Sequence, residues 1–382
     1  MGSCVRLLSI LLMLLSASLA LDLEPALEVQ ESATAWVSLD GQPVYYTSIK
    51  SIYTVDNQLV REMSNYAPNA EITLSPRGDH RLISTLQSMD AVKNSTRYAD
   101  YVVLDDHHEV QYSIQRGTDS DLKPLVAAVS DGGILALADP VNALIYLYSS
   151  GDLIAEGQIY REDGNLSMER NILMQWVGDR CYILLERPGF NGGPAGKSIF
   201  ISLNAQGQDQ ITAFLPITYL QDKVFDQGRF FVSGYDYSAT SGNYNPLIVE
   251  LDPTGQVLWT NENWGHELTL SGNGDYLGVL SSHEYIQLFD LSAKRVEKIR
   301  FDHQNKVCLG LAVNNVGKVA VIRVAADFFA KRNTHFGQIY FPLDGENVDI
   351  QIDPRYPRLF KIQTDGDRFY VGTSFEWLEI HR

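Results

Sequence analysis

The residues of this sequence that could do chemistry lie in a few short polar stretches. Asp105–Glu109 (DDHHE) places two adjacent histidines between carboxylates, and Thr118–Asp121 (TDSD) offers oxygen ligands. Histidine nitrogens and carboxylates bind zinc, and oxygen donors suit calcium. Adjacent residues of a strand point to opposite faces, however, so both histidines reach one metal only if a turn bends them together. A solvated turn is the simpler interpretation, and we expect no metal and no cofactor.

Two histidine–glutamate pairs, His266-Glu267 and His283-Glu284, could supply an acid and a base. Neither has a sequence partner that makes a catalytic triad recognisable. The stretch NGGPAGKS, residues 191–198, differs from a phosphate-binding loop by one residue, because an asparagine stands where the first glycine belongs. Such a loop needs a helix after its lysine, whereas the next residues, SIFISL, are rich in β-branched side chains and predict a strand. We therefore assign no catalytic residue and no nucleotide site.

Aromatic and arginine side chains gather in the long segments between apolar runs. Four of these segments are expected loops, at 84–101, 186–198, 233–246 and 323–337, and two shorter links lie at 260–267 and 353–359. Such side chains carry much of the binding energy at protein interfaces, although loop aromatics also pack against neighbouring loops. The candidate ligand-binding residues are Arg187, Phe190, Tyr235, Tyr237, Tyr244, Trp264, His266, Phe328, Phe329, Arg332, Tyr356 and Trp377.

These segments separate a repeated unit. Each unit contains a glycine turn between two short apolar runs, which predicts a β-hairpin, and a second hairpin follows in most units. Four strands every 40 to 50 residues, with almost no helical periodicity, favour a ring of stacked blades over a pair of β-sandwiches. We predict an all-β fold, a seven-bladed β-propeller of four-stranded antiparallel blades. The seven turns are at Gly78, Gly133, Gly178, Gly228, Gly274, Gly317 and Gly366.

Two of the hairpins, SPRGDHRLIS and SGNGDYLGVL, resemble those of TolB-type and WD-repeat-like propellers. This resemblance extends from Glu71 to the C-terminus. LDPTGQVLW, Leu251–Trp259, is similar to a quinoprotein repeat, in which a tryptophan docks between blades. The resemblance implies a β-propeller fold, and it transfers no quinone site because only one unit has this repeat.

The two ends of the chain suggest how the ring closes. The last unit stops at Arg382 after about three strands, and a spare hairpin lies at Ser51–Met63. Closing the ring with strands from both termini leaves fewer exposed sheet edges. We therefore expect the propeller to span residues 51–382. Residues 21–50 form an N-terminal extension or extra strands, and the hairpin at 35–49 is surplus to seven blades.

The N-terminal sequence and the composition indicate where the protein acts. One arginine precedes the apolar run Leu7–Leu15, and small residues follow up to Ala20, which predicts a signal peptide over residues 1–20 and a secreted or periplasmic protein. The net charge of −17 argues against nucleic acid and anionic membranes as partners, and no later segment is long enough for membrane insertion. We expect a monomer. Cys181 and Cys308 fall in distant units, so we expect both to be unpaired.

Two functions from different classes remain open. The first is a binding or scaffold module whose long-loop face binds a protein, a peptide or a glycan. The second is a hydrolase, lyase or sulfotransferase with acid and base groups at the central channel. Propellers host both functions, so the fold alone does not choose between them. Clustered aromatic side chains without converging titratable groups would favour binding, which the loop sequences already suggest.

Overall fold

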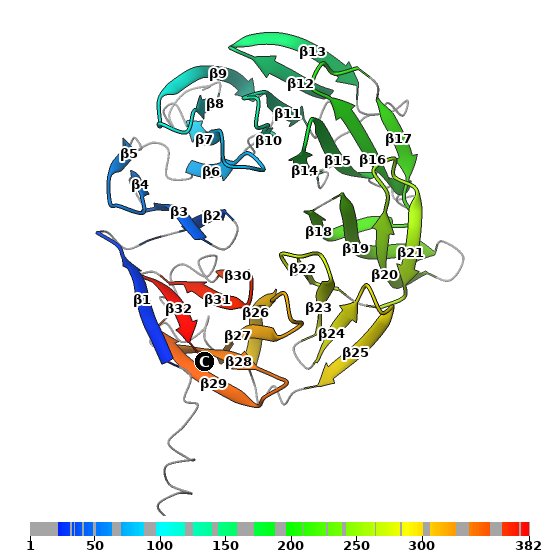
Figure 1. The fold of residues 1–382 in the computed structure, drawn as a ribbon. Helices are drawn as coiled ribbons and strands as arrows, with labels where there is room; N and C mark the ends of the chain where they lie inside the picture. The colour runs from blue at the N-terminus through cyan, green and yellow to red at the C-terminus, as the bar shows by residue number, and fades with distance from the viewer. Residues whose placement is uncertain are drawn as a thin grey trace, which may run out of the picture.

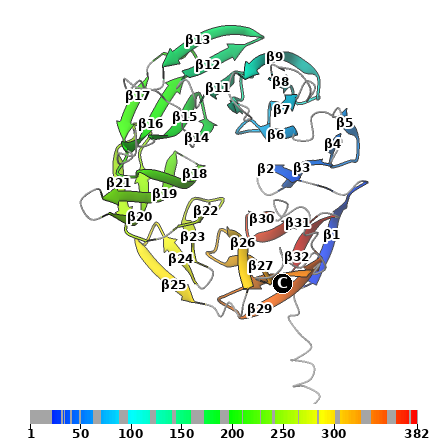
Figure 2. The same cartoon turned by 180° about the vertical axis from the view of Figure 1, so that it is seen from behind.

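A ring of small β-sheets makes up the described part of the protein. The computed structural model describes residues 22–30, 33, 35–39, 42–48, 51–62, 70–87, 97–118, 125–139, 144–158, 172–187, 196–208, 210–226, 228–238, 242–263, 265–282, 285–300, 306–325, 336–351, 361–373 and 376–381. These residues form 32 strands in eight four-stranded sheets. The sheets follow one another around the ring like blades, and the view from behind shows the same order (Figures 1 and 2). Within these ranges, no helix has the length and apolar character to cross a membrane.

Blades 1 to 4 each use four consecutive antiparallel strands. Blades 1 and 2 contain β2 (Ala35–Leu39), β3 (Gln42–Thr47), β4 (Ser51–Thr54), β5 (Leu59–Glu62), β6 (Ala70–Leu74), β7 (Arg81–Gln87), β8 (Arg97–Leu104) and β9 (Val110–Thr118). Blades 3 and 4 contain β10 (Val126–Val129), β11 (Leu135–Asp139), β12 (Leu144–Ser149), β13 (Asp152–Gln158), β14 (Ile172–Val177), β15 (Arg180–Arg187), β16 (Gly196–Asn204) and β17 (Ile211–Phe214).

Blades 5 to 7 repeat this order, and blade 8 combines both ends of the chain. Blades 5 and 6 contain β18 (Tyr219–Asp226), β19 (Arg229–Ser238), β20 (Asn243–Leu251), β21 (Val257–Asn261), β22 (Glu267–Leu270), β23 (Tyr276–Ser282), β24 (Tyr285–Asp290) and β25 (Arg295–Arg300). Blades 7 and 8 contain β26 (Lys306–Val313), β27 (Val319–Ala325), β28 (Phe336–Phe341), β29 (Glu346–Gln351), β30 (Lys361–Asp365), β31 (Arg368–Gly372), β32 (Glu376–His381) and β1 (Asp22–Glu28).

The glycine turns found in the sequence each join the first two strands of a blade. All seven glycines have φ between 59° and 78°, a region that residues with a Cβ rarely adopt. They occupy blades 2 to 8 in chain order. Because the strands of a blade alternate in direction, these turns and those between third and fourth strands lie at one face of the ring, the turn face. The connections between second and third strands and between blades lie at the opposite face, the loop face.

The prediction of seven blades is wrong, because the structure has eight. The additional blade is formed by β2 to β5. It contains the hairpin at 35–49, which was predicted as surplus, and the hairpin at Ser51–Met63, which was expected to close the ring. Closure instead uses β1, which pairs antiparallel with β32 over Asp22–Glu28. The proposed signal peptide, residues 1–20, lies outside the described residues.

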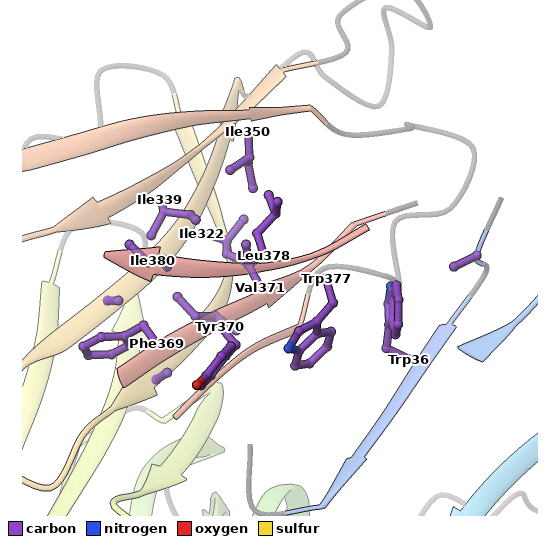
Figure 3. Close-up of a cluster of buried hydrophobic side chains, with 14 of the residues drawn as sticks. Trp36, Ile322, Ile339, Ile350, Phe369, Tyr370, Val371, Trp377, Leu378 and Ile380 are labelled. Carbon is purple, nitrogen blue, oxygen red and sulfur yellow. The ribbon is translucent and has the colours of Figure 1, made fainter. Parts of the chain in front are cut away.

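The hydrophobic core lies between the blades, because each sheet buries both faces against its neighbours. One cluster joins blade 8 to blades 1 and 7 and is built around Trp36 and Trp377, whose ring centroids are 5.3 Å apart (Figure 3). The Trp36 indole donates a hydrogen bond to the carbonyl oxygen of Thr373 at 2.7 Å. This cluster fastens the closing blade to the first one.

Neither Cys181 nor Cys308 forms a disulfide bond, as predicted, and both are buried. Cys181 lies on β15 of blade 4 and Cys308 on β26 of blade 7, at separate places around the ring. Burial raises the pKa of both thiols, that of Cys308 to about 12. Both therefore remain protonated and unreactive in the folded protein.

Candidate functional site

Four tyrosines gather at the loop face of blade 5. Tyr219 stands at the start of β18, directly opposite Tyr235 near the end of β19. Tyr237 follows two residues later and lies opposite Tyr244 at the start of β20. Alternate residues of a strand share a face, so this register places all four side chains on the same side of the sheet. We call Tyr219, Tyr235, Tyr237 and Tyr244 the tyrosine cluster.

Three rings of the cluster touch, and the cluster is in part accessible to solvent. The ring centroids of Tyr237 and Tyr244 are 5.1 Å apart, and those of Tyr219 and Tyr244 are 5.8 Å apart. Tyr244 is 55% exposed, while the other three are partly buried. Burial raises the pKa of Tyr219, with a smaller contribution from Tyr244, and burial also raises the pKa of Tyr235. The side chains of the cluster offer an apolar ring face and a hydroxyl group.

A charged pair borders the cluster on the side of blade 4. The Lys197 ammonium forms an ion pair with Asp236 and donates a hydrogen bond to the Pro216 carbonyl oxygen at 3.0 Å. Asp236 also accepts a hydrogen bond from the Thr218 hydroxyl group at 3.3 Å, and that hydroxyl accepts one from the backbone N–H of Tyr237 at 3.2 Å. These contacts link the end of β19 to β16 of the neighbouring blade. The backbone that carries Tyr237 is thus held from both sides.

Three carboxylates hold consecutive blades together near this face. Glu186 of blade 4 accepts a hydrogen bond from the Leu220 N–H of blade 5 at 2.6 Å. Asp222 of blade 5 accepts one from the Leu268 N–H of blade 6 at 2.7 Å, and Glu267 of blade 6 accepts one from the Leu311 N–H of blade 7 at 3.1 Å. Each bond satisfies a backbone donor of the next inner strand, and two of these strands, β18 and β26, have a β-bulge nearby. We call Glu186, Asp222 and Glu267 the carboxylate brace.

Burial changes the protonation of the brace. It raises the pKa of Glu267 to about 7, with repulsion from Asp222 adding to the shift, and it raises the pKa of Asp222 as well. Burial lowers the pKa of the adjacent Lys223, whose ammonium donates to the Gln175 side-chain oxygen at 2.9 Å. Glu267 could exchange a proton near neutral pH, but its hydrogen bond to the backbone gives it a structural role.

Three of the candidate binding residues form one cluster in the structure, and a fourth lies at the start of the next blade. Tyr235, Tyr237 and Tyr244 belong to the tyrosine cluster, and His266 precedes β22 of the next blade, with Nδ1 3.4 Å from the Gln221 side-chain oxygen. Arg187 ends β15, whose backbone reaches the same face, and nothing is described of its side chain. Phe190, Trp264, Phe328, Phe329, Arg332 and Tyr356 lie outside the described residues.

Trp377 is not at the surface. It is fully buried in the core between blades 8 and 1, where its ring packs against Trp36 and stacks with Tyr370 at 6.5 Å (Figure 3). Trp377 is the second residue of β32 and lies opposite Leu27 of the closing strand. We therefore leave it out of the candidate site.

Sequence reasoning also missed Tyr219, although its place at the start of an apolar strand after Pro216 was a usable signal.

Two of the polar motifs of the sequence lie in a turn and a strand, whereas Asp119–Asp121 and the pair His283-Glu284 lie outside the described residues. The Asp105 carboxylate accepts hydrogen bonds from the backbone N–H groups of His107 and Glu109, both at 2.9 Å, so this residue closes its own turn. His108 Nδ1 lies 2.9 Å from the Tyr45 hydroxyl group. The lysine of NGGPAGKS belongs to β16, as the predicted strand required. Among the described residues, no group of three or more His, Cys, Asp or Glu side chains is placed to hold a metal ion.

Comparison with solved structures agrees with this architecture. The crystal structure of BamB from Moraxella catarrhalis matches with a TM-score of 0.52 at 12% identity, over 94% of this chain and 98% of that chain. The C-terminal WD40 domain of Sif2 matches with a TM-score of 0.55 at 10% identity, over 95% and 99%. The chain is a β-propeller repeat protein. No protein-family model and no curated protein sequence matches this propeller.

Proposed function

We propose that the protein is an exported binding module that captures a protein partner through the loop face of its propeller. The observation that carries this proposal is the tyrosine cluster, in which a 55% exposed Tyr244 rests on Tyr219 and Tyr237. The predicted signal peptide supports export. The matched propeller folds fit a binding or scaffold role without indicating a ligand.

The geometry suits protein recognition for two reasons. Tyrosine loses little conformational entropy on binding, and here the rings are already held by one another and by the strand register. The ion pair between Lys197 and Asp236 lies at the same end of β19 but on its other face, toward blade 4, and leaves the lysine side chain 42% exposed. A central group of aromatic rings with charged residues at its border is the usual arrangement of an interface hot spot.

The test is capture of a partner by variants of the cluster. Tyr237→Ala and Tyr244→Ala should each weaken capture from native extracellular fluid by about 1–3 kcal/mol, which is roughly 5- to 150-fold in affinity. Tyr237→Phe should retain most of the binding because it keeps the ring. Leu343→Ala, a 45% exposed residue at a hairpin turn of blade 7, is the matched control on the turn face.

Comparing partner capture by variants of the loop face and of the turn face decides between the two faces. A partner recovered by cross-linking should bind the wild type and Leu343→Ala equally. Equal capture by the tyrosine variants, or loss of capture only with Leu343→Ala, would contradict the assignment of the loop face. Thermal unfolding of each variant separates lost binding from lost stability.

A further inference from the structure

A groove opens at the outer rim between blades 5 and 6, away from the loop face. It has a volume of about 360 Å³, and its apolar lining comes from Leu258 and Trp259 of β21, Phe289 of β24 and Val296 of β25. Leu258 is 59% exposed and Val296 is 51% exposed. Two neighbouring apolar side chains that remain more than half exposed offer surface for a partner.

The floor of the groove is rigid. Trp259 packs edge-on against Phe289 of the next blade, with ring centroids 5.2 Å apart. The Arg229 guanidinium donates two hydrogen bonds to one Glu250 oxygen, at 2.9 and 2.7 Å. The Asp290 carboxylate accepts hydrogen bonds from Ser292 and Ala293 in its own turn. Both carboxylates of the groove are therefore engaged within the protein, Glu250 by Arg229 and Asp290 by its own turn and by the Arg295 guanidinium at 4.0 Å.

The strand beside the groove is basic, in a chain whose net charge is −17. Residues 294–300 (KRVEKIR) contain four basic side chains and one acidic side chain. Val296 lies opposite Phe289 in the ladder, so Val296, Lys298 and Arg300 share the face turned toward blade 5, whereas Glu297 is on the other face. Within the described part of the chain, no ion pair engages Lys294, Lys298 or Arg300.

β25 is also an edge strand, because it pairs with β24 alone in its sheet. An edge strand presents backbone donors and acceptors that an extended segment can pair with. Other outer strands are weaker candidates on charge: β29 (ENVDIQ) and β13 (DLIAEGQ) each carry two carboxylates and no basic residue. Among the outer strands described, β25 is the only one at which a free edge, an apolar groove and basic side chains without an ion pair occur together.

We propose that this groove binds an extended acidic peptide segment of a partner protein. The segment pairs with the free edge of β25, places an apolar side chain against Leu258 and Val296, and sets its carboxylates opposite Lys298 and Arg300. Charge complementarity selects this occupant, since the net charge of −17 of the whole chain disfavours such a segment on average and β25 is locally basic. The site is separate from the tyrosine cluster and adds a second contact to the proposed function without depending on it.

The probe is a short fluorescein-labelled peptide of alternating glutamate and leucine, and the measurement is fluorescence anisotropy with the full-length protein. Val296→Asp and Lys298→Glu should each raise the dissociation constant at least ~fivefold, through lost apolar contact and reversed charge. Ile154→Asp, a 43% exposed residue of β13, is the matched control and should leave binding unchanged. Tyr237→Ala should also leave it unchanged, which separates this test from that of the loop face.

A peptide of alternating lysine and leucine should not bind, and added salt should weaken binding of the acidic peptide. Equal binding of both peptides, no binding of the acidic one, or full affinity in Val296→Asp would overturn the proposal. The groove could instead be occupied by a second copy of the chain, and sedimentation of the free protein tests this. A dimer that dissociates in Val296→Asp would assign the groove to a second copy and would also overturn the proposal.

Discussion

Replacing Glu267 by glutamine tests the reasoning behind the carboxylate brace. Glutamine keeps a side-chain oxygen that accepts the hydrogen bond from the Leu311 N–H, which the carboxylate now accepts at 3.1 Å. It removes the ionisable carboxyl group. Burial raises the pKa of this group from its ordinary value of 4.5 to about 7. The substitution therefore changes the titration of this position while it preserves the contact between blades 6 and 7.

The sign of the effect follows from proton binding. Between pH 4.5 and about 7 the folded protein keeps the Glu267 proton, whereas the unfolded chain releases it. The unfolded state thus binds fewer protons, and the free energy of unfolding decreases as pH rises through this range. Each pKa unit corresponds to about 1.4 kcal/mol, so the shift from 4.5 to about 7 costs the wild type about 3 kcal/mol by neutral pH.

Urea denaturation at a series of pH values measures this difference. The stability of Glu267→Gln relative to wild type should increase by about 3 kcal/mol from pH 4.5 to pH 7.5, since the glutamine does not titrate. Glu297→Gln, at an exposed position of β25, serves as the control. Surface substitutions usually change the free energy of unfolding by no more than about 0.5 kcal/mol. If the difference between Glu267→Gln and wild type stays constant with pH within that range, the assignment of a buried carboxyl group that holds its proton is refuted.

Two further predictions concern the core. Trp377→Ala should lower the free energy of unfolding by about 3–5 kcal/mol in urea titrations, because it empties a fully buried site against Trp36; unchanged stability would mean that the closing blade is not packed as described. Cys181 and Cys308 should both resist a thiol reagent in the native protein and both react after denaturation, and rapid labelling of either thiol in the native state would contradict its burial.

The sequence predicted the local units of the fold better than their number. Glycine turns such as Gly133 and Gly317 are determined by a few neighbouring residues, because positive φ requires glycine there. The eighth blade was missed because assigning β2 to β5 depends on knowing which strand completes the last blade. That strand is β1, and its pairing with β32 depends on residues at opposite ends of the chain.

The candidate site shows the same limit. Tyr235, Tyr237 and Tyr244 could be proposed from their type and spacing, but their meeting with Tyr219 depends on the register of three strands. Trp377 was assigned to a binding surface because of its aromatic residue type. Its burial results from the strand that pairs with it, which sequence spacing alone does not reveal.

The pairing of β1 with β32 has a consequence for biosynthesis. Glu28 lies 348 residues before its partner Glu376, and at ribosomal speeds of about 5–20 residues per second this interval is roughly 20–70 s. Until β32 is made, β1 lacks the only strand with which it pairs in the folded ring. Its sequence, DLEPALE, has three carboxylates and a proline, which oppose pairing with the edges of other nascent chains. The acidic character of this strand thus protects the chain during the period in which the ring is still open.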